Sequence, residues 1–187
     1  QAAFVGLTRK IRENLPFYLD RKQEITADLA AAERTLVGEE QRLEYEVISK
    51  EVQSAHQLYL KSQIEKHADL CEKMLQDYQQ FKADVQNHDY IAARQAILNV
   101  KNLLAQSEKL PDLPDSVRKN YEFQIKLFEN MPNELQHSIQ NQEFLQKCQA
   151  LQEVLTVGIP AAEKNHDEKQ INELLQQLND LERTLLE

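Results

Sequence analysis

Two short segments combine histidine with acidic residues, as many metal sites do. His88 is followed by Asp89, and His166 is followed by Asp167 and Glu168. Neither segment has the HxxxH or HExxH spacing that places two imidazoles on one face of a helix. Helix capping and solvated acidic side chains explain both segments better than a bound metal does. We therefore expect no metal site here.

The two cysteines, Cys71 and Cys148, are the candidates for thiol chemistry. Both fall on apolar positions of helical patterns, where a free thiol behaves as a small hydrophobic group. His67 lies one turn before Cys71, so a Cys/His pair is conceivable, but nothing near it supplies an oxyanion hole or an orienting acid. We favour a structural thiol and a histidine at the edge of the core. Since there is no CxxC motif, a reducing, cytosolic environment is expected.

Motifs that bind phosphate or carry an activated serine do not occur in the sequence. The chain has 3 glycines and 5 prolines, and it contains no GxGxxG, P-loop or GxSxG motif. A phosphate needs backbone amides presented by a tight turn, and this chain has few residues that make one. We expect no catalytic residue, no cofactor and no enzyme activity.

The charge of the chain argues against nucleic acid as a partner. Its 31 acidic residues outnumber its 22 basic ones and give a net charge of −9, whereas nucleic-acid binding requires a basic face. An acidic run is most simply a solvated helix face, and a docking surface for a basic partner is the alternative. The run consists of Glu39, Glu40, Glu44, Glu46 and Glu51.

Membrane contact is not expected for this segment. No apolar run approaches the roughly 18 residues of a membrane span, and no signal peptide opens the sequence. The first residue is Gln1 rather than Met. We therefore expect a fragment or a processed chain, and a membrane tether upstream of it stays an open alternative.

The composition indicates an all-α fold. Sheet proteins of this size consume many turn residues, which are scarce here. Hydrophobic residues make up 41% of the chain, charged residues 28% and aromatic residues 6%, as in long amphipathic helices with thin cores. The predicted architecture is an elongated antiparallel helical bundle or coiled coil, similar to spectrin repeats, with one very long helix.

The very long helix is predicted over residues 17–87, where the apolar positions keep a 3–4 spacing. Gly38 is the one glycine in this stretch. A lone glycine costs a helix about 1 kcal/mol relative to alanine, which weakens the helix without ending it. Residues 37–39 also look too short and too apolar for a hairpin loop, so we expect the helix to continue. Pro16 either lies in its first turn or kinks a helix that already runs from residue 3.

Three further segments are predicted to be helical. The first spans 89–110, after a polar reversal at residues 87–89, and the second runs from Pro114 with a kink at Pro132. Gly158 is expected to stop the second, and the last helix spans 166–187. The apolar residues of the last helix repeat at steps of 3 and 4, as in a coiled coil. They are Ile171, Leu174, Leu178, Leu181 and Leu185.

These lengths divide the chain into three segments. Residues 1–45 form the N-terminal part of the long helix, residues 46–131 a three-helix, spectrin-like bundle, and residues 132–187 a helical hairpin one helix short of a bundle. The apolar stripe of the first segment has no expected partner within the chain, so protein partners or a second copy in a homodimer should cover it. This candidate interaction stripe consists of Phe4, Leu7, Ile11, Tyr18, Ile25, Leu29, Leu36 and Leu43.

Several segments resemble the bacterial septation ring formation regulator EzrA family. Residues 88–94 (HDYIAAR) follow a long helix and look like the family's gDYxxA turn, with His88 where glycine is usual. Residues 110–113 (LPDL) fall where the family has a proline-containing turn. Residues 131–135 (MPNEL) are similar to its lPxxL step.

The resemblance continues to the end of the chain. Residues 171–174 (INEL) together with 185–187 (LLE) resemble the IDxL…LE ending of a repeat in that family. The similar region covers about residues 50–187. It implies a cytosolic arch of spectrin-like repeats, tethered to the membrane upstream, that modulates assembly of the tubulin-like division protein FtsZ. It supplies no catalytic residues.

The sequence therefore predicts a non-enzymatic structural and regulatory scaffold that acts through protein–protein contacts in cell division. We expect it in the cytoplasm. The alternative is a coiled-coil rod subunit of a vesicle-tethering or adaptor complex, because such rods share this composition.

Overall fold

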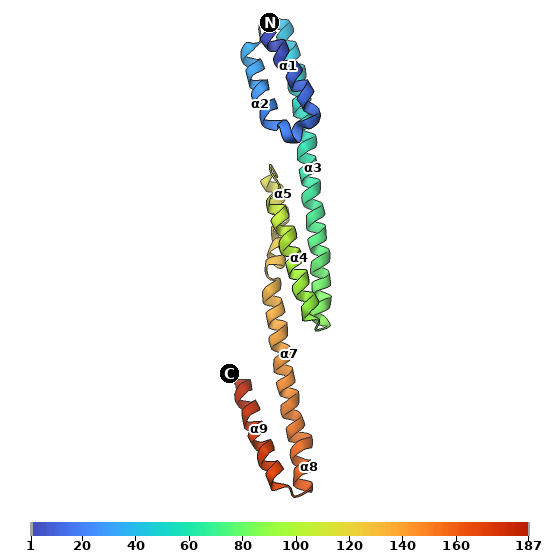
Figure 1. The fold of residues 1–187 in the computed structure, drawn as a ribbon, viewed down its shortest axis with the longest axis vertical. Coiled ribbons are helices and arrows are strands. Elements are labelled where there is room, and N and C mark those ends of the chain that lie inside the picture. Colours follow the sequence, from blue (N-terminus) through green and yellow to red (C-terminus); the bar gives the residue numbers. More distant parts are fainter. Residues whose placement is uncertain (1, 187) are drawn as a thin grey trace. The chain divides into compact units, whose positions relative to one another are not determined.

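The computed structural model describes residues 2–186, which are helical almost throughout and contain no strand (Figure 1). The predicted all-α class and the helical bundle are confirmed. The elements are α1 (Ala2–Asn14), a 3-10 turn η1 (Leu15–Phe17), α2 (Tyr18–Thr35), α3 (Gly38–Gln86), α4 (Tyr90–Glu108), α5 (Asp115–Asn120), α6 (Glu122–Glu129), α7 (Met131–Glu153), a π-helical turn η2 (Val154–Gly158), α8 (Ile159–Lys164) and α9 (Glu168–Leu186).

The described residues fall into two compact units. Unit 1 comprises residues 2–74 and 102–123, and unit 2 comprises residues 75–101 and 124–186. The three borders lie inside α3, α4 and α6, whereas the segments expected from the sequence end at positions 45 and 131.

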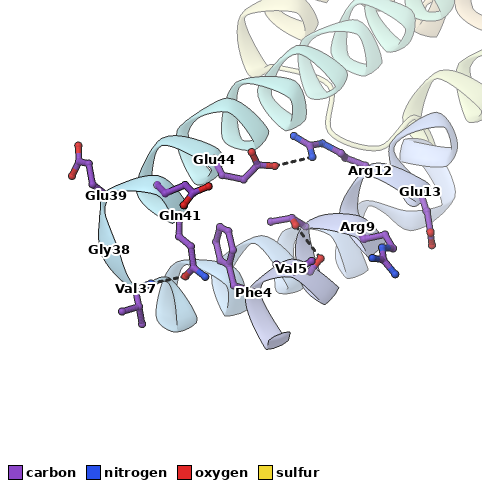
Figure 2. A pocket seen from close by; sticks show the side chains of 12 residues that line it. Phe4, Val5, Arg9, Arg12, Glu13, Val37, Gly38, Glu39, Gln41 and Glu44 are labelled. Atoms are coloured by element: carbon purple, nitrogen blue, oxygen red, sulfur yellow. Dashed lines mark hydrogen bonds and ion pairs between the residues drawn. The ribbon is translucent and has the colours of Figure 1, made fainter. Parts of the chain in front are cut away.

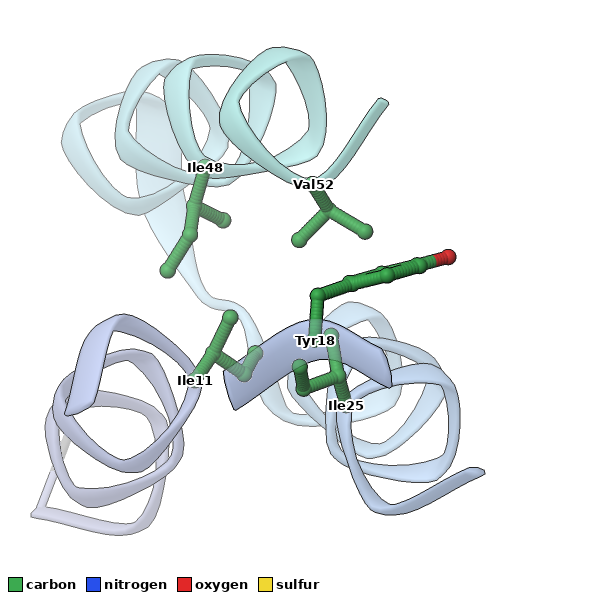
Figure 3. Packing of buried hydrophobic residues seen from close by; sticks show 5 residues of the cluster. All are labelled: Ile11, Tyr18, Ile25, Ile48 and Val52. Carbon is green, nitrogen blue, oxygen red and sulfur yellow. The ribbon is translucent and has the colours of Figure 1, made fainter. Parts of the chain in front are cut away.

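In unit 1, α1, α2 and the first part of α3 form a three-helix bundle. One core residue comes from α1, two come from α2 and two come from α3, and their side chains meet between the helices (Figure 3). Each helix thus buries one apolar stripe against the other two, which is the usual source of stability for amphipathic helices. The five residues are Ile11, Tyr18, Ile25, Ile48 and Val52.

The prediction of one continuous helix over residues 17–87 is wrong. α2 ends at Thr35, Leu36 is extended with φ −67° and ψ 139°, and α3 begins at Gly38 with φ +81°. A left-handed conformation is strained for residues with a Cβ atom and free for glycine. Gly38 therefore allows the chain to reverse over two connecting residues, and the longest helix is α3, with 49 residues.

Pro16 lies in η1, the corner at which the chain passes from α1 to α2. The missing N–H of proline costs nothing there, because the first turn of a helix has no acceptor for it. Pro16 is thus part of the connection of a helical hairpin. It is not a kink within one longer helix.

The predicted reversal at residues 87–89 is confirmed in unit 2. His88 takes a left-handed conformation with φ 60°. The carboxylate of Asp89 accepts a hydrogen bond from the Ala92 N–H at 3.1 Å, which caps the first turn of α4. The turn and the cap together start α4 at Tyr90, one residue later than the sequence pattern predicts.

The helix predicted from Pro114 is interrupted twice. Tyr121 separates α5 from α6, and Asn130 separates α6 from α7. Pro132 lies in the first turn of α7, where its missing N–H is harmless. The proline thus stands at the beginning of a helix and not at a kink inside one.

The predicted stop at Gly158 is wrong. The chain remains helical through η2 and enters α8, with Pro160 in its first turn. The Ile159 N–H donates to the Val154 carbonyl five residues back, so helical hydrogen bonding continues up to Pro160. The reversal comes later, where His166 is left-handed with φ 53° and Asp167 accepts from the Gln170 N–H at 3.0 Å.

Candidate functional site

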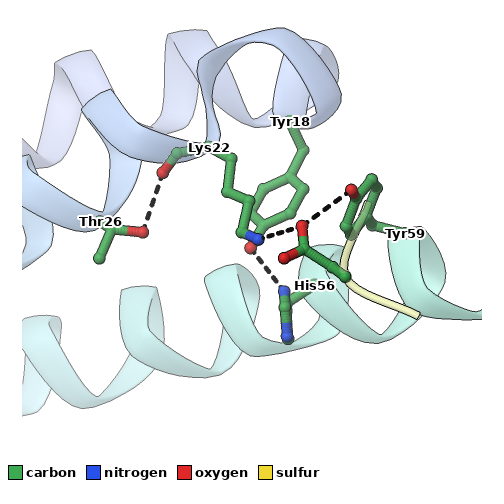
Figure 4. A network of polar contacts seen from close by, with 6 residues as sticks. Tyr18, Lys22, Thr26, His56 and Tyr59 are labelled. Carbon is green, nitrogen blue, oxygen red and sulfur yellow. Dashed lines mark hydrogen bonds and ion pairs between the residues drawn. The ribbon is translucent and has the colours of Figure 1, made fainter. Parts of the chain in front are cut away.

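A polar network joins α2, α3 and the loop after α4 within unit 1 (Figure 4). Lys22 forms an ion pair with the Asp112 carboxylate, and the Tyr59 hydroxyl donates to the same carboxylate oxygen at 3.0 Å. The Tyr18 hydroxyl lies 2.8 Å from Nδ1 of His56. Sequence spacing could not reveal this network, because Lys22 and Asp112 are 90 residues apart.

The contacts of this network favour the ordinary charge states of Asp112, Lys22 and Tyr18. The hydrogen bond from Lys22 lowers the pKa of Asp112, and the same contact raises the pKa of Lys22. Burial raises the pKa of the Tyr18 phenol. At neutral pH these groups are a carboxylate, an ammonium and a protonated phenol, so none of them is poised as a general base or nucleophile. The network cross-links helices.

The Cys/His pair considered from the sequence exists in unit 1. The Cys71 sulfur lies 3.8 Å from Nδ1 of His67, and both residues are buried. Burial raises the pKa of Cys71 and, with the charge of Arg118, lowers that of His67. The pair is therefore a neutral thiol and a neutral imidazole, whereas nucleophilic cysteines require the thiolate. His67 also packs edge-on against the Tyr121 ring, so it belongs to the core interior.

The two His/Asp segments serve as turns in the structure. His88 and His166 supply left-handed backbone, while Asp89 and Asp167 cap the helices that follow. Within residues 2–186, no three histidine, cysteine or acidic side chains gather in a way that could hold a metal ion.

The predicted interaction stripe lies mainly inside unit 1. The expectation that it lacks a partner within the chain is wrong, because the reversal at Gly38 returns α3 onto α1 and α2. Leu43 alone among its eight members is exposed, at 52%. Its buried members are Phe4, Ile11, Tyr18 and Ile25, and its half-buried members are Leu7, Leu29 and Leu36.

A cavity of about 1030 Å³ opens between α1, the α2–α3 connection and the start of α3 (Figure 2). Phe4 lines it, and Arg12 pairs across it with Glu44 at 2.7 Å. The Thr8 hydroxyl, which also lines it, donates to the Val5 carbonyl. No histidine or cysteine is among the described residues that line it.

The hairpin of α7, α8 and α9 in unit 2 is far less closed than the bundle of unit 1. In the described part of the chain after residue 135, Val154 and Ala162 are the only buried residues. All five coiled-coil positions of α9, from Ile171 to Leu185, are half-buried. Phe144 and Leu155 remain 54% and 49% exposed. The helices of this hairpin therefore leave part of their apolar surface exposed to solvent.

No helix in the described part of the chain has the length and hydropathy required to cross a bilayer. The chain matches no family model, no curated protein and no solved structure.

Proposed function

We propose that the chain is a non-enzymatic structural and regulatory scaffold that acts through protein–protein contacts. The α7–α9 hairpin carries this proposal, because it leaves large apolar side chains such as Phe144 and Leu155 in contact with water. Exposed apolar surface of this kind marks sites of protein interaction. The polar side chains of unit 1 support the proposal as well, since their pairing holds helices together.

The proposed partner is the division-ring protein FtsZ, and the proposed form of the helical units is spectrin-like. The resemblance described above supports both, and three of its segments fall at helix junctions. Residues 88–94 begin at the turn before α4, residues 110–113 form the connection after α4, and residues 131–135 open α7. The proposed location is the cytoplasm.

The basis of this proposal differs from the one that the sequence suggested. Most of the stripe from Phe4 to Leu43 is buried inside the bundle of unit 1, so it offers no continuous docking face. The hairpin, which was expected to lack one helix, now carries the interaction.

Co-sedimentation with purified FtsZ tests the proposal. We expect the chain to pellet with FtsZ polymers formed in GTP and to change the polymer mass measured by light scattering. The double variant Phe144→Glu/Leu155→Glu should weaken both effects, while Leu43→Glu, at an exposed position of unit 1, should not. Recovery of the chain in the supernatant, with polymer mass unchanged over a range of chain concentrations, would overturn the FtsZ proposal.

A further inference from the structure

One side of the α7–α9 hairpin presents apolar side chains from both helices. Val154 is buried, and Leu174 packs over Gly158, where an added Cβ would come within 3.3 Å of its side chain. In an antiparallel pair of helices, the residues that follow the facing positions by one point to the same side of the pair. Leu155 and Leu175 are those residues, and they are 49% and 43% exposed.

Phe144 extends this side along α7. It precedes Leu155 by eleven residues, or about three helical turns, and therefore lies on the same face. We call Phe144, Leu155 and Leu175 the open face. Apolar side chains on the same side of two neighbouring helices match the apolar stripe of a third helix laid along them.

The charges beside the open face are acidic. Glu168 and Glu182 lie seven residues before and after Leu175, on the same face of α9, and neither has an ion-pair partner among the described residues. Residues 131–186 contain nine acidic and four basic residues, a net charge of −5. Arg183 follows Glu182 by one residue, which turns it away from the open face, and it pairs with Asp180.

This negative charge favours a basic partner helix over a second copy of the chain as the occupant of the open face. A second copy of the chain would bring a further charge of −5 and its own Glu168 and Glu182 against the first pair, and juxtaposed like charges oppose association. A helix with leucine-like residues on one face and lysine or arginine on its flanks satisfies both the apolar side chains and the carboxylates.

We propose that the open face binds a basic amphipathic helix of a partner protein. This inference rests on the proposed scaffold function and names the class of partner surface that the hairpin accepts. The interaction has an apolar centre that supplies affinity and an acidic rim that selects the charge of the partner.

A labelled amphipathic peptide of leucine and lysine, about five helical turns long, is the probe. Its binding to the full chain is measured by fluorescence anisotropy, with a leucine–glutamate peptide of the same pattern as the control. We expect saturable binding of the lysine peptide alone, weakened by added salt. Phe144→Ser/Leu175→Ser, which removes the apolar side chains without adding charge, should weaken binding by about tenfold or more.

Charge-reversal variants distinguish the effect of the glutamates beside the open face on peptide binding from the effect of the overall charge of the hairpin. Glu168→Lys/Glu182→Lys should weaken binding of the lysine peptide. Glu153→Lys/Glu173→Lys is the matched control, because these residues precede Val154 and Leu174 and so point to the opposite side. Equal loss in both variants, equal binding of both peptides, or no binding of the lysine peptide would overturn the inference.

Two further measurements identify the occupant of the open face and separate this inference from the FtsZ proposal. Sedimentation equilibrium of the chain alone should show a monomer, and a dimer abolished by Phe144→Ser/Leu175→Ser would show that a second copy is the occupant, which overturns the inference. FtsZ co-sedimentation of the same variants separates the two proposals. If the peptide fails while FtsZ still pellets the chain, the partner class is wrong, and if neither binds, the scaffold function fails too.

Discussion

The Tyr18 hydroxyl lies 2.8 Å from Nδ1 of His56, and residue 37 stands midway between them in the sequence. Ile25 and Ile48, which share the buried core of unit 1, are placed about the same midpoint. Pairs that are symmetric about one position are the signature of an antiparallel helical hairpin. The reversal at Gly38 therefore determines how the N-terminal apolar stripe is buried.

Replacement of Gly38 by alanine should destabilise unit 1. A residue with a Cβ atom at φ +81° carries a strain of about 1–2 kcal/mol. Gly6 is the matched control, because it lies inside α1 with nothing within 4 Å of an added Cβ. Gly6→Ala should stabilise the chain by about 0.5–1 kcal/mol. Urea unfolding followed by circular dichroism measures both changes, and equal signs for the two variants would contradict this role of Gly38.

Truncation of Ile25 should strongly destabilise unit 1. Ile25 is fully buried, and replacing such a residue by alanine costs about 2–5 kcal/mol. Leu43→Ala, at the exposed end of the stripe, should change the free energy of unfolding by less than about 0.5 kcal/mol. The same urea titration compares them. Similar small effects, accompanied by a change in association state for Ile25→Ala, would show that the stripe faces a partner instead of the bundle.

The buried His67 should make unit 1 sensitive to mild acid. Burial and the nearby charge of Arg118 lower its pKa in the folded chain below the ordinary value of 6.5. As the pH falls below about 6.5, the unfolded chain therefore binds a proton that the folded chain resists, and stability decreases. Burial raises the pKa of Cys71, so it stays a neutral thiol in this range, and the Tyr121 ring packs edge-on against His67.

Unfolding free energies at pH 7.5 and 5.5 measure this effect. His67→Gln should reduce the loss of stability between the two values, whereas His137→Gln, at an exposed position on α7, should leave it unchanged. An identical pH dependence in the parent chain and in His67→Gln would mean that other groups dominate.

Much of the helical architecture could be predicted from local signals. The 3–4 spacing of apolar residues predicts helices. The polar turn at residues 87–89 and the prolines at positions 111 and 114 mark connections, because capping and missing donors act within a few residues. Asp89 and the loop around Asp112 are found where these signals place them.

The two glycine interpretations failed because the same residue fits different environments. A glycine such as Gly38 is tolerated inside a helix and can also adopt a left-handed conformation. The packing of Ile48 and Val52 against α1 and α2 stabilises the reversed chain, so the left-handed conformation is the one found. Gly158 was expected to end a helix, but it remains helical beneath the Leu174 side chain. Such choices depend on contacts between distant segments.

Hydrogen–deuterium exchange of the chain alone tests most directly whether the α7–α9 hairpin is open while the bundle of unit 1 is closed. Exchange follows local opening, which is easiest where few apolar side chains are buried. We predict that amides in α9 exchange much faster than those in α2 around Ile25, and that the lysine peptide slows exchange in α9 and in α7 around Phe144. Protection of α9 equal to that of α2 in the free chain, with no change on adding the peptide, would contradict the account.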